Sequence, residues 1–170
     1  SDGTATVANS TFSGNTAQAG KDAWGGGIYV ESSTADITNA IVWGNVADVE
    51  PGIYAGYSST LNLTYSCVQG WTGGGTGNTA ADPLLADPDG QDNVLGTADD
   101  DVRLTSGSSA IDTASDAAVP DDTFDVDGDG DADEALPWDL GRGDRFLGTG
   151  PTVDMGAYEY LNTNGLGDPE

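Results

Sequence analysis

The first 80 residues alternate apolar and polar side chains over short stretches that end at Gly, Asn or Ser. Alternation with a period of two places successive side chains on opposite faces of a β-strand. The stretches are too short and too evenly interrupted to form long helices, so the pattern predicts an all-β fold. The apolar side chains that we expect to point into the core are Val7, Ile28, Ile37, Val42, Ile53 and Leu63.

These stretches recur at nearly constant intervals. The motif N-x-I/T-φ-x-G-N-x-A, where φ is apolar, covers residues 9–17 and again 39–47, an offset of 30 residues. Gly-Ile-Tyr occurs at residues 27–29 and again 25 residues later, at 52–54. Repeats of about 20–50 residues are typical of solenoids, in which each repeat stacks on the one before. Residues 1–80 are therefore expected to form a short right-handed parallel β-helix of about three coils.

Two asparagines, Asn15 and Asn45, occupy equivalent positions in the first two repeats. Asparagine tolerates the left-handed backbone conformation that tight bends require, so we expect both residues to adopt it. An amide that recurs once per coil can also hydrogen-bond to its neighbour in the next coil. We therefore predict an asparagine ladder along one corner of the β-helix.

The composition changes after the repeats. Residues 70–80 form a glycine-rich connector, and no lysine follows them as a phosphate-binding loop would require. Residues 81–160 are acidic and rich in turn-forming residues, so we expect a loop-rich, calcium-braced segment that packs back on the β-helix. Residues 161–170 are expected to be a linker or a frayed end.

The chain is strongly acidic, with 29 acidic and 4 basic residues and a formal net charge of −25 at pH 7. Nucleic acids and anionic membranes are disfavoured as partners, because no basic patch neutralises their phosphates. No apolar run approaches the roughly 18 residues of a membrane span. Cys67 is the only cysteine, so no intramolecular disulfide forms. The abundance of Gly, Asp, Asn, Ser and Thr favours an extracellular or cell-surface location.

Eight of the acids lie within residues 121–134, where carboxylates alternate with small residues. Such a run stays out of a core, because each unpaired buried charge costs several kcal/mol. It can instead curl around Ca²⁺, which takes about 6–8 oxygen ligands from loops with alternating Asp and a following Gly. Leu136 stands where an EF-hand has its bidentate Glu, so the match is to a general calcium loop. The expected ligands are the carboxylates of Asp125, Asp127, Asp129 and Asp133 and the main-chain carbonyl of Asp131.

A second group of six acids lies within residues 87–101, where Pro88 and Gly90 favour a turn that brings carboxylates together. The chain has no histidine, and oxygen ligands alone argue against zinc, so we expect Ca²⁺ here as well. The alternative for both acidic segments is a solvated loop without an ion. The expected ligands in this second group are Asp87, Asp89, Asp92, Asp99, Asp100 and Asp101.

Four motifs follow one another in the second half of the chain. They are D-P-D-G-x-D-x-x-x-G-T-x-D-D-D-x-R-L at residues 87–104, S-x-A-I-D at 108–112, D-x-D-G-D at 125–129 and V-D-M-G-A-Y-E-Y at 153–160. Together with the repeats, this series resembles the C-terminal portion of secreted bacterial β-helix proteins of the choice-of-anchor Q type. The resemblance implies a right-handed parallel β-helix, secretion and a cell-surface or extracellular place, and it implies no established catalytic residues.

The function that we expect is a non-enzymatic extracellular structural module, stabilised by calcium, that self-associates head to tail into a filament, fibre or surface layer. One alternative is a carbohydrate-binding or adhesive module, which predicts an exposed row of aromatic side chains on one face. Another is a polysaccharide-degrading β-helix enzyme, which predicts a groove with Arg103 among ordered carboxylates. The absence of histidine excludes a Ser-His-Asp triad.

Overall fold

The computed structural model describes residues 3–18, 22–146 and 153–161. These residues form ten short strands and one 3₁₀ turn, and they include no α-helix. Apart from Leu161, the expected linker or frayed end lies outside the described residues. The elements are β1 (Gly3–Ala8), β2 (Thr11–Ser13), β3 (Ile28–Val30), β4 (Ser33–Thr38), β5 (Ile41–Trp43), β6 (Ile53–Ala55), β7 (Thr60–Thr64), β8 (Cys67–Val68), β9 (Leu85–Asp87), β10 (Asp101–Leu104) and the 3₁₀ turn η1 (Asp116–Ala118).

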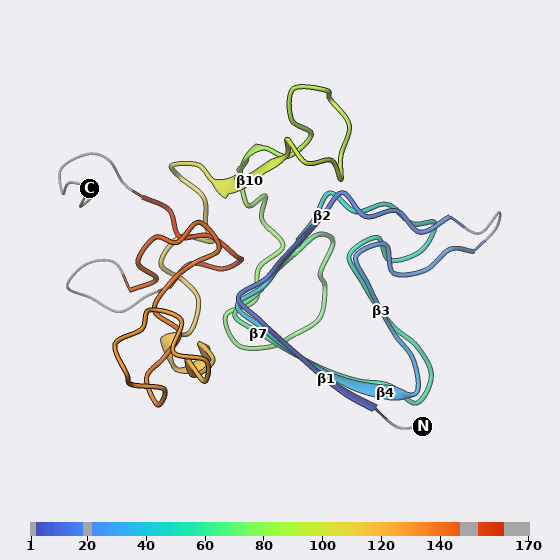
Figure 1. Ribbon diagram of the computed structural model, residues 1–170. Coiled ribbons are helices and arrows are strands. Elements are labelled where there is room, and N and C mark those ends of the chain that lie inside the picture. The colour runs from blue at the N-terminus through green and yellow to red at the C-terminus, as the bar shows by residue number, and fades with distance from the viewer. Residues whose placement is uncertain (1–2, 19–21, 147–152, 162–170) are drawn as a thin grey trace.

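Strands from successive repeats pair side by side and in parallel. β1, β4 and β7 form one sheet, β2, β5 and β8 form a second, and β3 and β6 form a third. In the first sheet Val7 lies opposite Ile37, which in turn lies opposite Leu63. The coils therefore overlie one another in Figure 1, with strands along the sides of a common interior. This arrangement confirms the prediction of an all-β fold made of stacked parallel strands.

The interior of the coils is the first hydrophobic core. Alternation along each strand turns every second side chain inward, and Ile37 and Val42 are only 2% and 0% exposed. Val7 and Ile28 are partly buried and pack against the same cluster. The inward-facing residues expected from the sequence therefore do line the core, which also contains Val30, Ala35, Ala40, Ile53, Leu63 and Val68.

The asparagine ladder is present at the predicted corner. The Asn15 main-chain N–H donates to the Asn45 Oδ1 at 2.9 Å, and the Asn15 side-chain amide donates to the same oxygen at 3.0 Å. Asn45 in turn donates to the Phe12 carbonyl at 2.9 Å. The expected left-handed conformation of Asn15 and Asn45 is wrong, because Gly14 and Gly44 directly before them take it, with φ of 70° and 69°.

The left-handed asparagines are found one bend earlier, between the first two sheets. Asn9 and Asn39 have φ of 46° and 52°, and Tyr65 takes the equivalent position in the third repeat with φ of 47°. The Asn39 amide also fastens the second half of the chain to this bend. Its Nδ2 donates to the Ser115 carbonyl at 2.9 Å, and its Oδ1 accepts the Ser115 N–H at 2.8 Å.

A second hydrophobic core lies on the outer side of the sheet that contains β5 and β8. Ile41 points away from the coil interior, yet both it and Cys67 are fully buried. Residues from the second half of the chain cover them, and these include Leu104, Ala110, Val153 and Met155. Burial raises the pKa of the Cys67 thiol to about 12, so this cysteine is a packing residue rather than a nucleophile.

Candidate metal centre

The acidic run at residues 122–134 forms a loop that is closed at its base. Asp121 and Ala135 form an antiparallel bridge, and the Asp122 N–H donates to the Glu134 carbonyl at 2.8 Å. One residue further out, the Leu136 N–H donates to the Pro120 carbonyl at 2.8 Å. The two ends of the loop are therefore held opposite each other, so that the side chains of Asp122 and Glu134 start from neighbouring positions.

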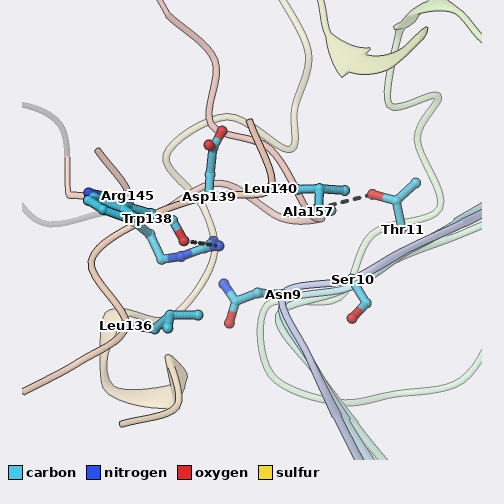
Figure 2. Close-up of a pocket in the computed structure, with 9 residues that line it drawn as sticks. All are labelled: Asn9, Ser10, Thr11, Leu136, Trp138, Asp139, Leu140, Arg145 and Ala157. Carbon is cyan, nitrogen blue, oxygen red and sulfur yellow. Dashed lines mark hydrogen bonds between the residues drawn. The ribbon is translucent and has the colours of Figure 1, made fainter. Parts of the chain in front are cut away.

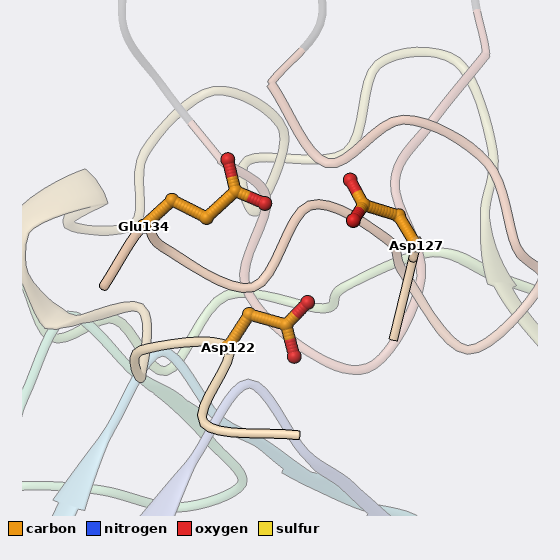
Figure 3. A group of neighbouring side chains, drawn as sticks. All are labelled: Asp122, Asp127 and Glu134. Atoms are coloured by element: carbon orange, nitrogen blue, oxygen red, sulfur yellow. The ribbon is translucent and has the colours of Figure 1, made fainter. Parts of the chain in front are cut away.

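Three carboxylates from different parts of this loop converge, those of Asp122, Asp127 and Glu134. Each offers an oxygen, and the three oxygens lie within 4.8 Å of one another. Figure 3 shows the carboxylates pointing toward a common space between them. Asp122 is buried, while Asp127 and Glu134 are half-buried, so the group lies at the floor of the loop rather than at its tip.

Two oxygens of this group are buried without a hydrogen-bond partner. Asp122 is 1% exposed, and its Oδ2 accepts the Val126 N–H at 2.8 Å, whereas its Oδ1 has no partner. The Glu134 Oε1 is likewise buried and unpartnered. A buried carboxylate oxygen without a donor is strongly unfavourable unless a cation or a proton compensates it. Among the residues that the structure describes, no hydrogen-bond donor or basic side chain is paired with either oxygen.

A second group, Asp125, Asp127 and Asp129, lies nearer the surface and shares Asp127 with the first. Its oxygens also lie within 4.8 Å of one another. The loop backbone already uses part of this group, because Asp125 Oδ1 accepts the Gly130 N–H at 3.2 Å and Asp129 Oδ1 accepts the Asp131 N–H at 2.8 Å. The alternating spacing therefore places three of the expected ligands together.

The carboxylates of Asp131 and Asp133 belong to neither group. Both residues are exposed, and the Asp131 Oδ1 accepts the Asp133 N–H at 3.0 Å. Binding through the Asp131 main-chain carbonyl stays a prediction. The residues that sequence reasoning missed are Asp122 and Glu134, which lie outside the alternating ligand positions. They are brought together only by the backbone bridge at the base of the loop, and the spacing of residues along the sequence does not predict that bridge.

The electrostatics of the loop favour cation binding. Partial desolvation raises the pKa of Glu134, and the negative charges of Asp129, Asp127, Asp131 and Asp122 raise it further. Residues 122–134 include no basic residue that would oppose these two causes. A divalent cation relieves both causes at once, since it supplies the missing partner and neutralises the repulsion.

The second acidic segment, residues 87–101, is organised differently. The Asp99 carboxylate accepts the Gln91 N–H at 2.8 Å and the Thr97 hydroxyl at 2.7 Å, and these hydrogen bonds, the Thr97 one foremost, lower its pKa. Asp100 accepts the Gly96 N–H at 2.6 Å, and Asp92 accepts the Val94 N–H at 2.9 Å. These carboxylates satisfy the backbone of their own loop.

The remaining acids of this segment lie on or beside the β9–β10 hairpin. Asp87 and Asp101 face each other across the antiparallel pair, and Asp89 lies within the turn that follows β9. Asp101 binds the Arg103 guanidinium, with Nε donating to Oδ1 at 2.8 Å. Within the described residues, no three of the six expected ligands converge as the loop carboxylates do. Calcium binding here stays a prediction.

A cavity of about 410 Å³ lies beside the bend at Asn9 and is shown in Figure 2. Trp138 and Arg145 line it from the second half of the chain. Arg145 is 3% exposed and pairs with Glu159 at 3.0 Å, and it also donates to the Trp138 carbonyl. The buried Asn9 amide has no hydrogen-bond partner here, unlike that of Asn39 one coil away.

Aromatic side chains gather on the outer face of β3 and β6. Tyr29 and Tyr54 are register partners, and their rings stack with centroids 5.3 Å apart. Trp24 adds a third ring, 4.5 Å from Tyr54. Trp24 and Tyr29 are 39% and 50% exposed, so this group forms an exposed aromatic patch.

No family model, curated protein or solved structure matches this chain. Among the described residues, no helix has the length and apolar character needed to cross a membrane.

Proposed function

We propose that this chain is a non-enzymatic structural module of the extracellular space or the cell surface, of the choice-of-anchor Q type. Its first half is then a right-handed parallel β-helix of about three coils. The observation that carries the proposal is the in-register stacking of strands from successive repeats over a continuous core, fixed at one corner by the Asn15–Asn45 ladder. Such an arrangement extends by addition of further units.

The first coil offers a surface for the head-to-tail self-association that we propose. Within the described residues, β1 pairs with β4 on one side only. A hollow of about 410 Å³ opens at this end, lined by apolar side chains such as Ala5 and Val7. Such an edge over an open core is covered either by further coils of a longer chain or by a strand from a second copy, and we propose the second copy. A head-to-tail contact that does not close on itself gives a filament or fibre.

Self-association is tested by electron microscopy and light scattering of the purified chain. Ala5 aligns with the buried Ala35, so its side chain faces the open core. We expect Ala5→Asp to abolish assembly, because a second copy would bury the new charge without a partner. Thr4→Asp is the matched control, since Thr4 is one residue away and points to the other face. Monomers alone in the wild type, or full assembly of Ala5→Asp, would contradict the proposal.

The non-enzymatic part of the proposal is supported by the state of Arg103. If Arg103 were the catalytic base of a polysaccharide-degrading enzyme, its guanidinium would have to be free to reach a substrate. Instead, two of its nitrogens donate hydrogen bonds to the Asp101 carboxylate. The pair lies on an exposed hairpin. We expect no double-bond or reducing-end products when the chain is incubated with acidic polysaccharides, which is measured by ultraviolet absorbance and a reducing-sugar assay.

A carbohydrate-binding or adhesive module is the second candidate, and the exposed aromatic patch of Trp24, Tyr29 and Tyr54 favours it. Aromatic faces on a surface can stack on sugar rings. Binding to a panel of polysaccharides tests this candidate. Trp24→Ala should then weaken binding, whereas Tyr57→Ala should not, since Tyr57 is 92% exposed and belongs to no aromatic pair.

We further propose that calcium stabilises the module. The support is the loop at residues 122–134, which contains two overlapping clusters of three carboxylates each. Oxygen-only ligands on an irregular loop suit Ca²⁺, which accepts flexible geometry, better than Mg²⁺, which demands a near-octahedral arrangement.

A further inference from the structure

We infer that Asp122, Asp127 and Glu134 form the principal calcium site of the chain, and that the ion locks the base of the loop onto the second hydrophobic core. This inference rests on the proposed calcium stabilisation, and it adds which residues bind the ion and how binding stabilises the fold. It shifts the centre of the site from the alternating Asp125–Asp133 run to the floor of the loop.

Two buried acceptors of this cluster have no donor in the described residues. Asp122 is 1% exposed, its Oδ1 and the Glu134 Oε1 are unpartnered, and the two carboxylates point toward a common space (Figure 3). Asp122 is also held in place, because its other oxygen accepts the Val126 N–H and its own N–H is fixed by Glu134. A rigid, buried carboxylate with an open oxygen is the expected state of a cation ligand.

The carboxylates of the alternating run are less buried than that of Asp122. Asp127, Asp129 and Asp131 each accept the N–H group two residues further along the chain, as in turns that need no ion, and Asp129 and Asp131 are exposed. Asp122 differs from them in its burial and in its unpartnered Oδ1. Asp127 belongs to both carboxylate clusters, so the cluster of Asp125 and Asp129 adjoins the proposed site through this residue. Backbone carbonyls and water complete the roughly 6–8 oxygens that Ca²⁺ takes.

The site lies between two chain segments that pack against the second hydrophobic core. Val119 lies just before the loop and is buried in the second hydrophobic core, while Ala135 and Leu136 lie just after it and pack against the same core. Without a cation, the repulsion between Asp122 and Glu134 acts to push these two packed segments apart. An ion between them therefore stabilises the whole fold and not the loop alone.

The test compares calcium binding and thermal unfolding of the full chain and its variants, with CaCl₂ or with chelator. In CaCl₂, we expect Asp122→Asn and Glu134→Gln each to weaken calcium binding by about tenfold or more, measured by titration calorimetry, because each removes a charged ligand. The matched controls Asp131→Asn and Asp133→Asn remove a charge from the same loop outside both groups. They should leave the affinity within about threefold of the wild type.

In chelator we expect the change in melting temperature caused by Asp122→Asn to have the opposite sign, which distinguishes a metal ligand from a structural residue. The substitution removes a buried charge that has no counter-charge, and the new amide oxygen can still accept the Val126 N–H. The melting temperature in chelator should therefore equal or exceed that of the wild type. In calcium the same variant should melt below the wild type. A variant that melts lower in both conditions would overturn the inference, because Asp122 would then be a structural residue only.

The inference and the proposed calcium stabilisation fail in different ways. If calcium raises the wild-type melting temperature and Asp122→Asn and Glu134→Gln respond equally well, the site is wrong while the stabilisation stands. If Asp131→Asn or Asp133→Asn abolishes binding instead, the alternating run is the site. If calcium neither binds to the wild type nor shifts its melting temperature, both statements fail.

Discussion

Asn39 is the residue that most directly ties the two halves of the chain together. Its side chain pairs with both main-chain groups of Ser115, 76 positions further along the sequence. Asn9 occupies the same position one coil earlier, with a similar left-handed backbone and an amide that contacts no hydrogen-bond partner. A comparison of the two positions therefore distinguishes the effect of the left-handed backbone, which both residues share, from the effect of the side-chain hydrogen bonds, which only Asn39 makes.

Replacing Asn39 by glycine should destabilise the chain by about 1–3 kcal/mol, because the part-buried Ser115 N–H loses its acceptor and the Ser115 carbonyl keeps only the Ala118 N–H as a donor. Glycine keeps the left-handed backbone, so the change removes only the side chain. Asn9→Gly is the matched control and should cost less than about 1 kcal/mol. Urea unfolding measures both variants, and equal losses would mean that the bend alone matters.

Two buried acids, Asp154 and Glu159, predict how stability depends on pH. Burial foremost raises the pKa of Asp154 from 3.8 to about 6 and that of Glu159 from 4.5 to about 8. Nearby carboxylates raise both pKa values further, while the backbone N–H donors and Arg145 partly oppose the shifts. A carboxyl group whose pKa is raised by folding binds its proton more tightly in the folded state. The contribution of these groups therefore falls as the pH rises from about 4 to about 8.

The free energy of unfolding in chelator should accordingly decrease between these pH values, and the decrease should be shallower between pH 4 and 6 in Asp154→Asn. The slope is the readout, because the variant also disturbs the hydrogen bonds from Asp112 and Tyr160. Asp22→Asn removes one exposed charge and serves as control. An unchanged slope in Asp154→Asn would mean that this group does not titrate in the window.

At the scale of the strands, the interior of the coils could be predicted from the sequence and the outer core could not. Period-two alternation is a local property, so it identifies Ile37 and Leu63 as inward-facing without further knowledge. Ile41 sits beside Val42 and points outward, and it is buried only because residues such as Leu104 and Met155 return to cover it. Those partners lie more than 60 positions further along the chain, beyond any local pattern.

The candidate metal site likewise has one part that could be predicted from the sequence and one part that could not. Alternating spacing groups Asp125, Asp127 and Asp129, since side chains two positions apart in a tight loop converge without help from elsewhere. Asp122 and Glu134 meet only because a bridge closes the loop base. Their pairing depends on tertiary packing, and nothing in the local sequence reports it.

Ile41→Ala tests the outer core. The side chain is fully buried between β5 and the second half of the chain, so its truncation should cost about 2–5 kcal/mol. Val46→Ala, at a position that is 50% exposed, should cost less than about 1 kcal/mol. Both values follow from urea unfolding. A cost at Ile41 as small as that at Val46 would contradict the packing of the second half against β5.

At the scale of the whole molecule, the formal charge of −25 adds an electrostatic repulsion that opposes the compact state. Eight of the acids lie within residues 121–134, so the repulsion is concentrated where the second core begins. We therefore propose that calcium is a component of the fold. The proposed assembly into filaments would add a second demand for cations, since stacking would bring further like charges together.

The most direct test of this account is the thermal unfolding of the wild-type chain in millimolar CaCl₂ and in chelator, with light scattering on the same samples. At a calcium concentration about 100-fold above the dissociation constant, binding adds about 2.7 kcal/mol. For a chain of this size that raises the melting temperature by about 5–10 °C. The account predicts this rise, and predicts that an equal concentration of MgCl₂ gives a smaller one. Identical melting curves in CaCl₂ and in chelator would contradict it.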